Sequence, residues 1–392
     1  MTKLVIYTEN YFPGGLEQFI FDILKSNLFD IHLVVNSENN RLIEFAINND
    51  INHSIINLNN KSFGANSSKF FKFFNFIMRY IYMLPNYYKI KSILKSIPSF
   101  KNILIVNGGY PAALSCFSAV VAANSLHFEK IGLSILSSPS SNYSSVLFRM
   151  FEQRIDHFID RYVDIYIPNS NRIKLDLIEK VKIKSEKIET VYTGIEIKND
   201  TNKIVVLSLP QIEIQKKENE VWIGMIALLG STKRQDLLIT AMAQLDDNVK
   251  LLITGDGPTN DDLRNQVKLL NLESRVFFTG WIDNPEIIYK FIDIIAFMSD
   301  QEGLPYSISE AMSYKVPIIA SAVGGIVEQV IDEKGGFLIH ENSIIKLVEK
   351  IKILQNNNEL QNEFIEYSFR RLNKLFSLEA MNNRLVEIYA EG

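Results

Sequence analysis

The feature that most constrains the fold is an alternation, along the whole chain, between short β-rich runs and longer segments with a helical period of apolar residues. A strand, a crossover helix and a further strand, repeated this often, predict parallel sheets with helices on both faces. The strand-like runs are 4–7, 31–35, 103–106, 165–167, 222–225, 250–254, 276–279, 294–298 and 317–320, and the helix candidates include 16–28, 236–244, 261–270 and 309–314. The sequence therefore predicts an α/β protein.

The length of 392 residues favours two domains, and each half begins with a strand, a loop and a helix. Residues 195–220 mix acids, lysines and asparagines and carry only short apolar runs, so the boundary is expected there. This segment is either a loose linker or a hairpin at the edge of the second domain. We predict a first domain over 1–195, a second over 196–376, and a C-terminal helix within 377–392 that returns to the first domain.

Cysteine content and apolar runs bear on the cellular compartment. Cys116 is the single cysteine, which excludes an intrachain disulfide and a cysteine metal cluster and fits a reducing compartment. The first strand breaks at once into a turn-like sequence, unlike a signal peptide. Residues 102–128 carry no charge, but Asn107-Gly-Gly-Tyr-Pro111 interrupts them, so a strand, a turn and a packed helix are expected rather than a membrane span. A cytoplasmic protein is predicted.

The formal net charge of −4 argues against a nucleic-acid partner, but the charge is unevenly distributed. Residues 51–128 contain no acid and eight basic residues, so the remainder carries −12. Lys69, Lys72 and Arg79 alternate there with phenylalanine and tyrosine. Two interpretations stay open: an interfacial helix that contacts an anionic membrane, or a core helix with snorkelling lysines.

The stretch from Met298 to Met312 is the most informative for chemistry. A buried strand ends there, Glu302 and Gly303 follow on a loop, and Pro305 suits the first turn of a helix that contains Glu310. The amides that begin such a helix form an anion site, for example for a diphosphate. Carboxylates beside an anion are expected to accept hydrogen bonds from neutral sugar or ribose hydroxyls.

Two further strand ends carry candidate ligand residues. Gly255, Asp256 and Gly257 follow a buried strand, at the edge where open α/β sheets bind ligands. Trp281 ends the next strand and is either a platform for a planar base or a packed tryptophan. Lys233, after the strand at 221–227, is either an exposed lysine or a group that stabilises a departing phosphate.

Together these stretches resemble the family-4 retaining glycosyltransferases (glycosyl transferases group 1), enzymes of the GT-B fold. The resemblance is strong over 222–339, from the Lys233 loop through Thr-Gly-Asp-Gly-Pro258, Thr-Gly-Trp281 and the Glu302 to Glu310 stretch. It is looser in the first half, where Tyr11-Phe-Pro-Gly-Gly-Leu-Glu17 is similar to a glycine loop of the family. The implied architecture is two Rossmann-like, doubly wound domains that face each other across a cleft.

The resemblance implies transfer of a hexose-type sugar from a nucleotide-sugar donor, with UDP-sugar favoured, to a hydroxyl of a glycan or lipid-linked acceptor, with retention and without an essential metal ion or other cofactor. Glu302 would contact the donor hexose and Glu310 the ribose. Lys233 would stabilise the departing diphosphate. The donor-binding residues expected beside these are Gly14, Gly15, Arg234, Gly255, Asp256, Gly257, Trp281, Gly303 and Leu304.

The sequence departs from the family at two positions. Leu228 stands where the family usually has an arginine about five residues before its lysine, and Arg234 is expected to compensate. Residues 133–139 carry serines where the first domain usually supplies a histidine. These departures keep two alternatives open. One is a non-catalytic relative that binds a nucleotide sugar or a partner enzyme, and the other is a GT-B-like epimerase, against which the paired glutamates argue.

Overall fold

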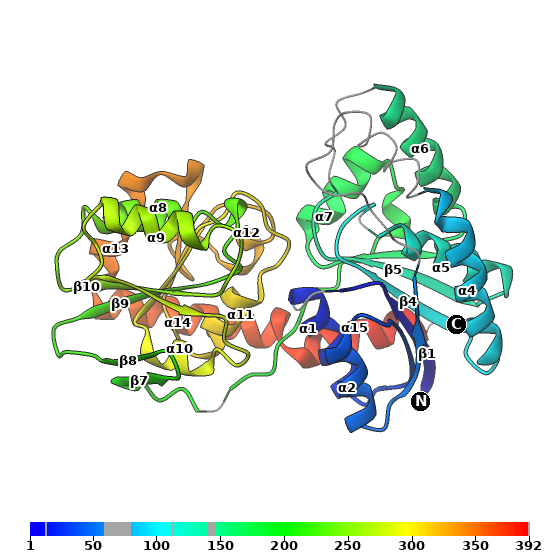
Figure 1. Cartoon of the computed structure of the whole chain (residues 1–392), viewed down its shortest axis with the longest axis horizontal. Coiled ribbons are helices and arrows are strands. Elements are labelled where there is room, and N and C mark those ends of the chain that lie inside the picture. Colours follow the sequence, from blue (N-terminus) through cyan, green and yellow to red (C-terminus); the bar gives the residue numbers. More distant parts are fainter. Residues whose placement is uncertain (12–13, 59–79, 112, 140–145, 199, 391–392) are drawn as a thin grey trace. The chain divides into compact units, whose positions relative to one another are not determined.

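The computed structural model describes the chain except for residues 12–13, 59–79, 112, 140–145, 199 and 391–392. It divides into two compact units, which comprise residues 1–193 with 381–392 (unit 1) and residues 194–380 (unit 2). Each unit contains one six-stranded parallel sheet with helices on both faces (Figure 1). The predicted α/β class is confirmed.

Unit 1 has the strand order β3-β2-β1-β4-β5-β6, so the first strand lies in the middle of the sheet. The strands are β1 (Thr2–Thr8), β2 (Phe29–Asn36), β3 (Asn52–Ile56), β4 (Asn102–Asn107), β5 (Lys130–Ile135) and β6 (Ile165–Pro168). The helices are α1 (Gly15–Lys25), α2 (Asn40–Asn48), α4 (Met83–Ser96), α5 (Leu114–Ser125), α6 (Val146–Asp160), α7 (Asn171–Asp176), η1 (Leu177–Val181) and η2 (Ser185–Lys187).

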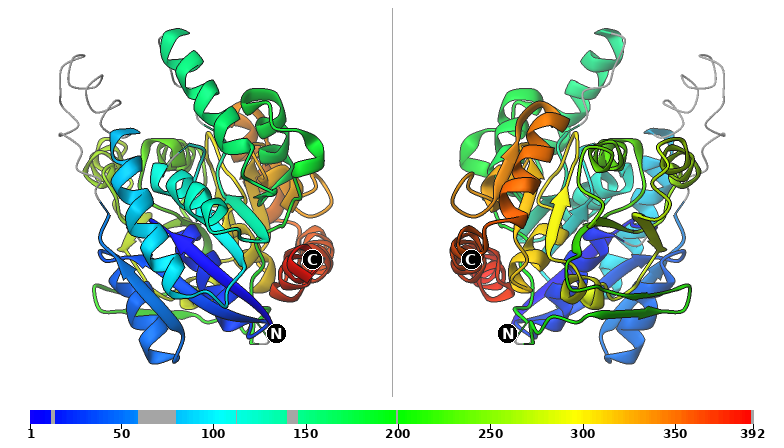
Figure 2. Two further views of the ribbon diagram at one scale, coloured as in Figure 1. Left: turned by 90° about the vertical axis from the view of Figure 1, so that its right-hand side faces the viewer. Right: turned by 90° about the vertical axis from the view of Figure 1, so that its left-hand side faces the viewer.

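Burial explains the strand pattern in unit 1. Residues 4–7 of β1 are fully buried, as expected for a strand covered by helices on both faces. The helices α4 and α5 lie side by side over one face of the sheet (Figure 2, left). The charge-free residues 102–128 form β4, a turn and α5. Tyr389 near the C-terminus donates a hydrogen bond of 3.1 Å to the Ile103 carbonyl oxygen, which anchors the end of the chain to this sheet.

Unit 2 repeats the same topology, with the strand order β11-β10-β9-β12-β13-β14. Its strands are β9 (Val221–Ile226), β10 (Val249–Thr254), β11 (Val276–Gly280), β12 (Ile294–Phe297), β13 (Ile318–Ser321) and β14 (Phe337–Ile339). Its helices are η3 (Ser231–Lys233), α8 (Gln235–Met242), α9 (Asn260–Leu269), α10 (Glu286–Phe291), α11 (Tyr306–Ser313), α12 (Ile326–Gln329), η4 (His340–Asn342), α13 (Ile344–Gln355), α14 (Asn358–Arg371) and η5 (Leu372–Phe376), and α15 (Leu378–Ala390) runs from unit 2 into unit 1.

The segment 195–220 contains an antiparallel hairpin of β7 (Val206–Leu209) and β8 (Ile212–Gln215), so of the two alternatives the structure shows the hairpin. In unit 2, α8 and α9 cover one face of the sheet and α10 and α11 the other (Figure 1). Within the described part of the chain, we find no helix with the length and apolar character needed to span a bilayer.

Candidate active site

The predicted site residues of unit 2 gather at the carboxyl ends of the parallel strands. The central strand β9 pairs with β10 on one side and with β12 on the other. Chain order therefore reverses at β9, and open α/β sheets bind ligands in the crevice outside such a switch point. The loop after β9 carries Lys233, and the loop after β12 carries Glu302. The sheet thus brings together residues that lie 69 positions apart.

Lys233 and Glu302 form an ion pair at this point. The Lys233 ammonium donates to Glu302 Oε1 and lies 5.7 Å from the centre of the Phe297 ring. The Glu302 side chain is only 8% exposed, against 23% for Lys233. Backbone contacts fix both loops, since the Asp300 amide donates to the Thr232 carbonyl oxygen at 2.8 Å. A buried carboxylate and a more accessible ammonium group therefore lie side by side in the candidate site.

The Glu302 loop also packs tightly against the turn after β13. Gly324 has a φ of +55°, and a Cβ atom there would lie 1.9 Å from the Glu302 carbonyl oxygen. The Gly325 amide donates to the Gly303 carbonyl oxygen at 2.7 Å. Gly324 therefore holds the Glu302 backbone in place. The sequence prediction did not assign this role, although the Gly324-Gly325 pair after a strand is a signal for such a turn.

Arg234 lies beside Lys233, but two carboxylates hold its side chain. Its Nε and Nη2 donate to the two oxygens of Asp236 at 3.0 Å each, and Nη1 donates to Asp300 at 3.1 Å. The hydrogen bond to Asp236 raises the pKa of Arg234, and Asp300 adds to the effect. The Leu228 side chain is 56% exposed. Arg234 thus lies next to Lys233, but its guanidinium N–H groups donate to Asp236 and Asp300.

Glu310 lies on α11, whose N-cap is Pro305. The buried Tyr289 of α10 donates its hydroxyl to Glu310 Oε2 at 2.6 Å. Burial of the carboxylate raises the pKa of Glu310, while the Tyr289 hydroxyl and nearby Lys198 lower it. The sequence analysis missed Tyr289, because it lies 21 residues before Glu310 and carries no local motif.

Gly255 and Gly257 have a packing role that their sequence position did not reveal. A Cβ atom at Gly255 would lie 2.0 Å from the Ala227 carbonyl oxygen, and one at Gly257 would lie 2.3 Å from the Leu229 carbonyl oxygen. Asp256 Oδ1 accepts from the Gly257 amide at 2.7 Å, and its carbonyl oxygen accepts from the Leu229 amide at 3.0 Å. This loop therefore supports the Lys233 loop by close backbone contact.

The remaining predicted residues lie after β11, in the Glu302 loop before α11, and at the start of α1. Trp281 follows β11, is 46% exposed and donates to Asp283 at 3.2 Å, so it is a surface tryptophan rather than a packed one. Leu304 and Gly303 are buried in the loop before α11. Gly14 is the N-cap of α1 in unit 1, and Gly15 is the first residue of that helix.

The residues predicted for membrane contact, Lys69, Lys72 and Arg79, lie outside the described residues. Within the described ranges, no group of three or more histidine, cysteine, aspartate or glutamate side chains is placed to hold a metal ion.

Comparison with known proteins identifies the domain. Residues 211–371 match the model of glycosyl transferases group 1. The chain is 29% identical over 176 residues to poly(ribitol-phosphate) alpha-N-acetylglucosaminyltransferase of Staphylococcus aureus, which covers 44% of this chain and 36% of the relative. It is 27% identical over 205 residues to N-acetylgalactosamine-N,N'-diacetylbacillosaminyl-diphospho-undecaprenol 4-alpha-N-acetylgalactosaminyltransferase of Campylobacter jejuni, which covers 51% of this chain and 53% of the relative. The chain thus spans about a third to a half of these relatives.

Solved structures match over the full length. HepE of Anabaena, in complex with UDP, superposes with a TM-score of 0.79 at 18% identity and covers 100% of both chains. This likeness confirms the predicted two-domain GT-B fold. The recognition of a group 1 glycosyltransferase domain is confirmed as well, while the assignment to family 4 stays a prediction.

Proposed function

We propose that this group 1 glycosyltransferase is a retaining enzyme that transfers a hexose-type sugar from a nucleotide-sugar donor, with UDP-sugar favoured, to a hydroxyl of a glycan or lipid-linked acceptor. The observation that carries the proposal is the Lys233 and Glu302 pair at the switch point of the unit 2 sheet. In this pair, Lys233 is a cation that can stabilise a leaving diphosphate, and Glu302 beside it can accept hydrogen bonds from sugar hydroxyls. The reaction belongs to surface polysaccharide or glycoconjugate synthesis, in the cytoplasm.

Each residue of the site receives one task. Lys233 and the amides of Gly303 and Leu304 stabilise the negative charge that develops on the diphosphate as the glycosidic bond breaks, without an essential metal ion. Glu302 accepts a hydrogen bond from a hexose hydroxyl. Tyr289 occupies one oxygen of Glu310, so we assign the other oxygen, Oε1, to a ribose hydroxyl. Trp281 supplies an exposed ring near the base.

The comparisons support the choice of substrates. The Campylobacter jejuni relative is named for a diphospho-undecaprenol substrate, and HepE was solved with UDP. A lipid-linked acceptor and a UDP-sugar donor fit the same chemistry here. Gly14 and Gly15 of unit 1 remain predicted donor-binding residues, as the family resemblance implies.

The test combines binding and turnover. A panel of nucleotides and nucleotide sugars should raise the melting temperature selectively for one base and one sugar, because a ligand that binds the native state stabilises it. Transfer to a lipid-linked or glycan acceptor should yield a product with the anomeric configuration of the donor. The Glu302→Gln variant should bind the nucleotide but lose transfer. An inverted product would contradict the retaining mechanism, and donor binding by the wild type without turnover would favour the non-catalytic alternative.

A further inference from the structure

Asn342, the last residue of η4 after β14, has an unusual backbone conformation. Its φ is +48°, and the φ of Glu341 before it is +53°. Residues other than glycine seldom adopt this left-handed region, and those that do cluster at functional sites, where the surrounding structure holds them in place. Asparagine tolerates the region because its short polar side chain can form local hydrogen bonds. The side-chain contacts of Asn342 give a reason for the conformation.

The Asn342 amide joins the ends of two neighbouring strands by hydrogen bonds. Its Nδ2 donates to Asp300 Oδ1, after β12, at 2.8 Å, and its Oδ1 accepts from the hydroxyl of Ser321, the last residue of β13, at 2.5 Å. A carboxylate can only accept hydrogen bonds, so the amide nitrogen has to face Asp300 and the amide oxygen is left for Ser321. Both ends of the amide therefore have the partner that suits them.

Two buried serines anchor the Asn342 amide to the Lys233 loop. The Ser299 amide donates to Ser321 Oγ at 3.0 Å, and the Ser299 hydroxyl donates to the Thr232 carbonyl oxygen, also at 3.0 Å. Ser299 and Ser321 are 0% exposed, so water does not compete for these hydrogen bonds. Asn342 is thus held at a fixed place relative to the backbone that precedes Lys233.

The nitrogen side of the amide leads to Arg234. Asp300 Oδ1 accepts from Asn342 Nδ2 and, at 3.1 Å, from Arg234 Nη1. A guanidinium group carries five N–H donors. Within the described part of the chain, three of those of Arg234 donate to Asp236 and Asp300, so two remain for a ligand. The Asp300 side chain is 46% exposed and would be free to turn toward water without Asn342, and the direction of the two remaining N–H groups would then be lost.

We propose that Asn342 is a positioning residue of the candidate active site. It fixes the Asp300 carboxylate, which in turn directs the Arg234 guanidinium, beside Lys233, toward the second phosphate of the donor nucleotide. The proposal rests on the proposed function, because it takes the diphosphate as the ligand of this part of the site. It gives Arg234 a defined role where Leu228 offers no charge.

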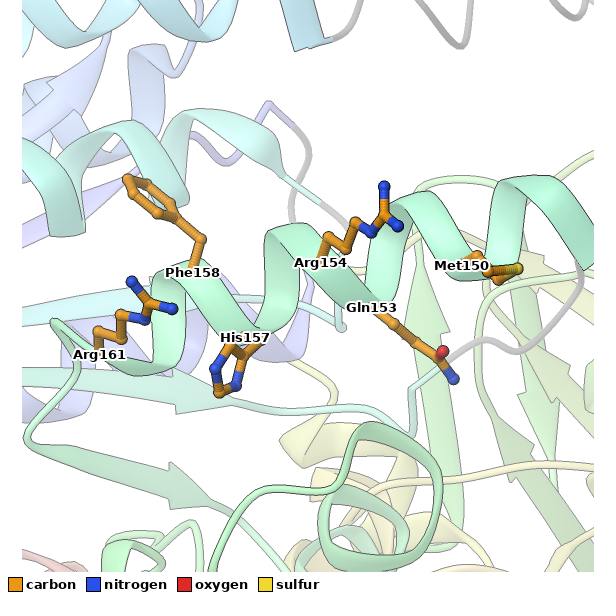
Figure 3. Close-up of a pocket in the computed structure, with 6 residues that line it drawn as sticks. All are labelled: Met150, Gln153, Arg154, His157, Phe158 and Arg161. Atoms are coloured by element: carbon orange, nitrogen blue, oxygen red, sulfur yellow. The ribbon is translucent and has the colours of Figure 1, made fainter.

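Titration calorimetry of the full chain with UDP and UMP tests the proposal, since only UDP carries the second phosphate. Asn342→Gly keeps the left-handed backbone but removes the amide. It should weaken UDP binding about fivefold to tenfold and UMP binding less than about twofold. Asn342→Asp should weaken UDP binding further, because a second carboxylate would then face Asp300. The control is Gln153→Glu, which makes the same change from amide to acid at an exposed position beside the hollow along α6 of unit 1 (Figure 3) and should leave both affinities unchanged.

A double-mutant cycle tests whether Asn342 acts through Asp300. In an Asp300→Ala background, Asn342→Gly should change the UDP affinity less than about twofold, because the carboxylate that Asn342 positions is already absent. The same loss in this background as in the wild type would overturn the proposal. Circular dichroism and melting temperature confirm that each variant is folded.

Three further results would overturn the proposal. One is wild-type UDP affinity in Asn342→Gly, which would leave Asn342 with a backbone role alone. Another is an equal loss of UDP and UMP binding, which would indicate a general disturbance of the loop. The third is a wild type that binds UDP no more tightly than UMP. No turnover is needed, so a wild type that prefers UDP but transfers no sugar would count against the proposed transfer alone. Unchanged UDP binding by Asn342→Gly in an enzyme that transfers sugar would count against the role of Asn342 alone.

Discussion

The two sheets of this chain have the same strand order but different side chains at their switch points. In unit 2 the loops after β9 and β12 bring together a lysine and a buried glutamate. In unit 1 the loop after β1 carries Glu9, whose Oε2 accepts from the Ser115 hydroxyl and whose Oε1 accepts from Tyr11 at 3.3 Å. One topology thus supports a charged pair in one unit and a carboxylate bonded to hydroxyls in the other. The fold selects the location of a site, and the side chains select its ligand.

The largest expected effect comes from removing the cation of unit 2. We expect Lys233→Met to lower kcat by about 10²–10³-fold, because the departing diphosphate loses its preorganised charge. The variant also leaves the buried Glu302 carboxylate without its partner, which should cost about 2–3 kcal/mol of folding stability. Steady-state transfer assays and urea unfolding measure the two effects.

Two variants isolate the catalytic part of that loss. Lys233→Met combined with Glu302→Gln removes both charges and should recover most of the stability but none of the turnover. Glu9→Gln, at the equivalent edge of unit 1, should leave kcat unchanged. If Glu9→Gln lowered kcat as strongly as Lys233→Met, the chemical contrast between the two sheets would be wrong.

The glycines sharpen the same contrast. Gly255→Ala should destabilise the chain by roughly 3 kcal/mol, because the new Cβ would meet the Ala227 carbonyl oxygen at 2.0 Å and φ is +137°. Gly108→Ala, after β4 of unit 1, places its Cβ 3.4 Å from the Leu16 side chain and should change stability by less than about 1 kcal/mol. Urea unfolding compares the two. Equal losses would mean that the loops of unit 2 are not packed more tightly than those of unit 1.

The sequence predicted the parallel strands and the sheet edge at which the candidate site lies, but it did not predict the contacts between the site residues. Apolar periodicity identifies parallel strands, and such strands end at one edge, so Lys233 and Glu302 were expected near the same ligand. The direct contact between them depends on the pairing of β9 with β12, which strand propensity does not encode. Arg234 was expected to face the donor, but Asp236 and Asp300 engage it. Tyr289 contacts Glu310 from a distant segment, and no short-range motif signals that contact. The Gly324-Gly325 pair signals a turn after a strand, but not the contact of that turn with Glu302.

Asp156, which takes part in no ion pair among the residues that the structure describes, should respond to pH differently from Glu302 of unit 2, which is paired with Lys233. Burial raises the pKa of Asp156 in unit 1 from 3.8 to about 7. Between these two pH values the folded chain binds more protons than the unfolded chain. The free energy of unfolding therefore decreases as the pH rises, and the contribution of Asp156 to this decrease is complete above about pH 7. Asp156→Asn should therefore flatten the decline in melting temperature across this range and stabilise the chain at pH 8. Asp262→Asn, on exposed α9, is the control, and an unchanged slope in Asp156→Asn would contradict the assignment.

The smallest expected effect concerns Glu310 of unit 2. The Tyr289 hydroxyl binds this glutamate, whereas the Lys233 ammonium group binds Glu302. Tyr289→Phe removes the 2.6 Å hydrogen bond to Glu310 and should weaken nucleotide binding by about threefold to tenfold, with little change in kcat. Burial already raises the pKa of Glu310, and the Tyr289 hydroxyl opposes that rise. Without the Tyr289 hydroxyl, the Glu310 carboxylate becomes protonated at a higher pH. As the pH is lowered, the nucleotide affinity of Tyr289→Phe should therefore begin to fall at a higher pH than that of the wild type. Tyr314→Phe retains the Tyr289 hydroxyl and the stacked ring at 5.3 Å, and should keep the wild-type profile. Calorimetric titration from pH 5 to 8 measures both variants, and identical profiles for Tyr289→Phe and Tyr314→Phe would show that Tyr289 does not position Glu310.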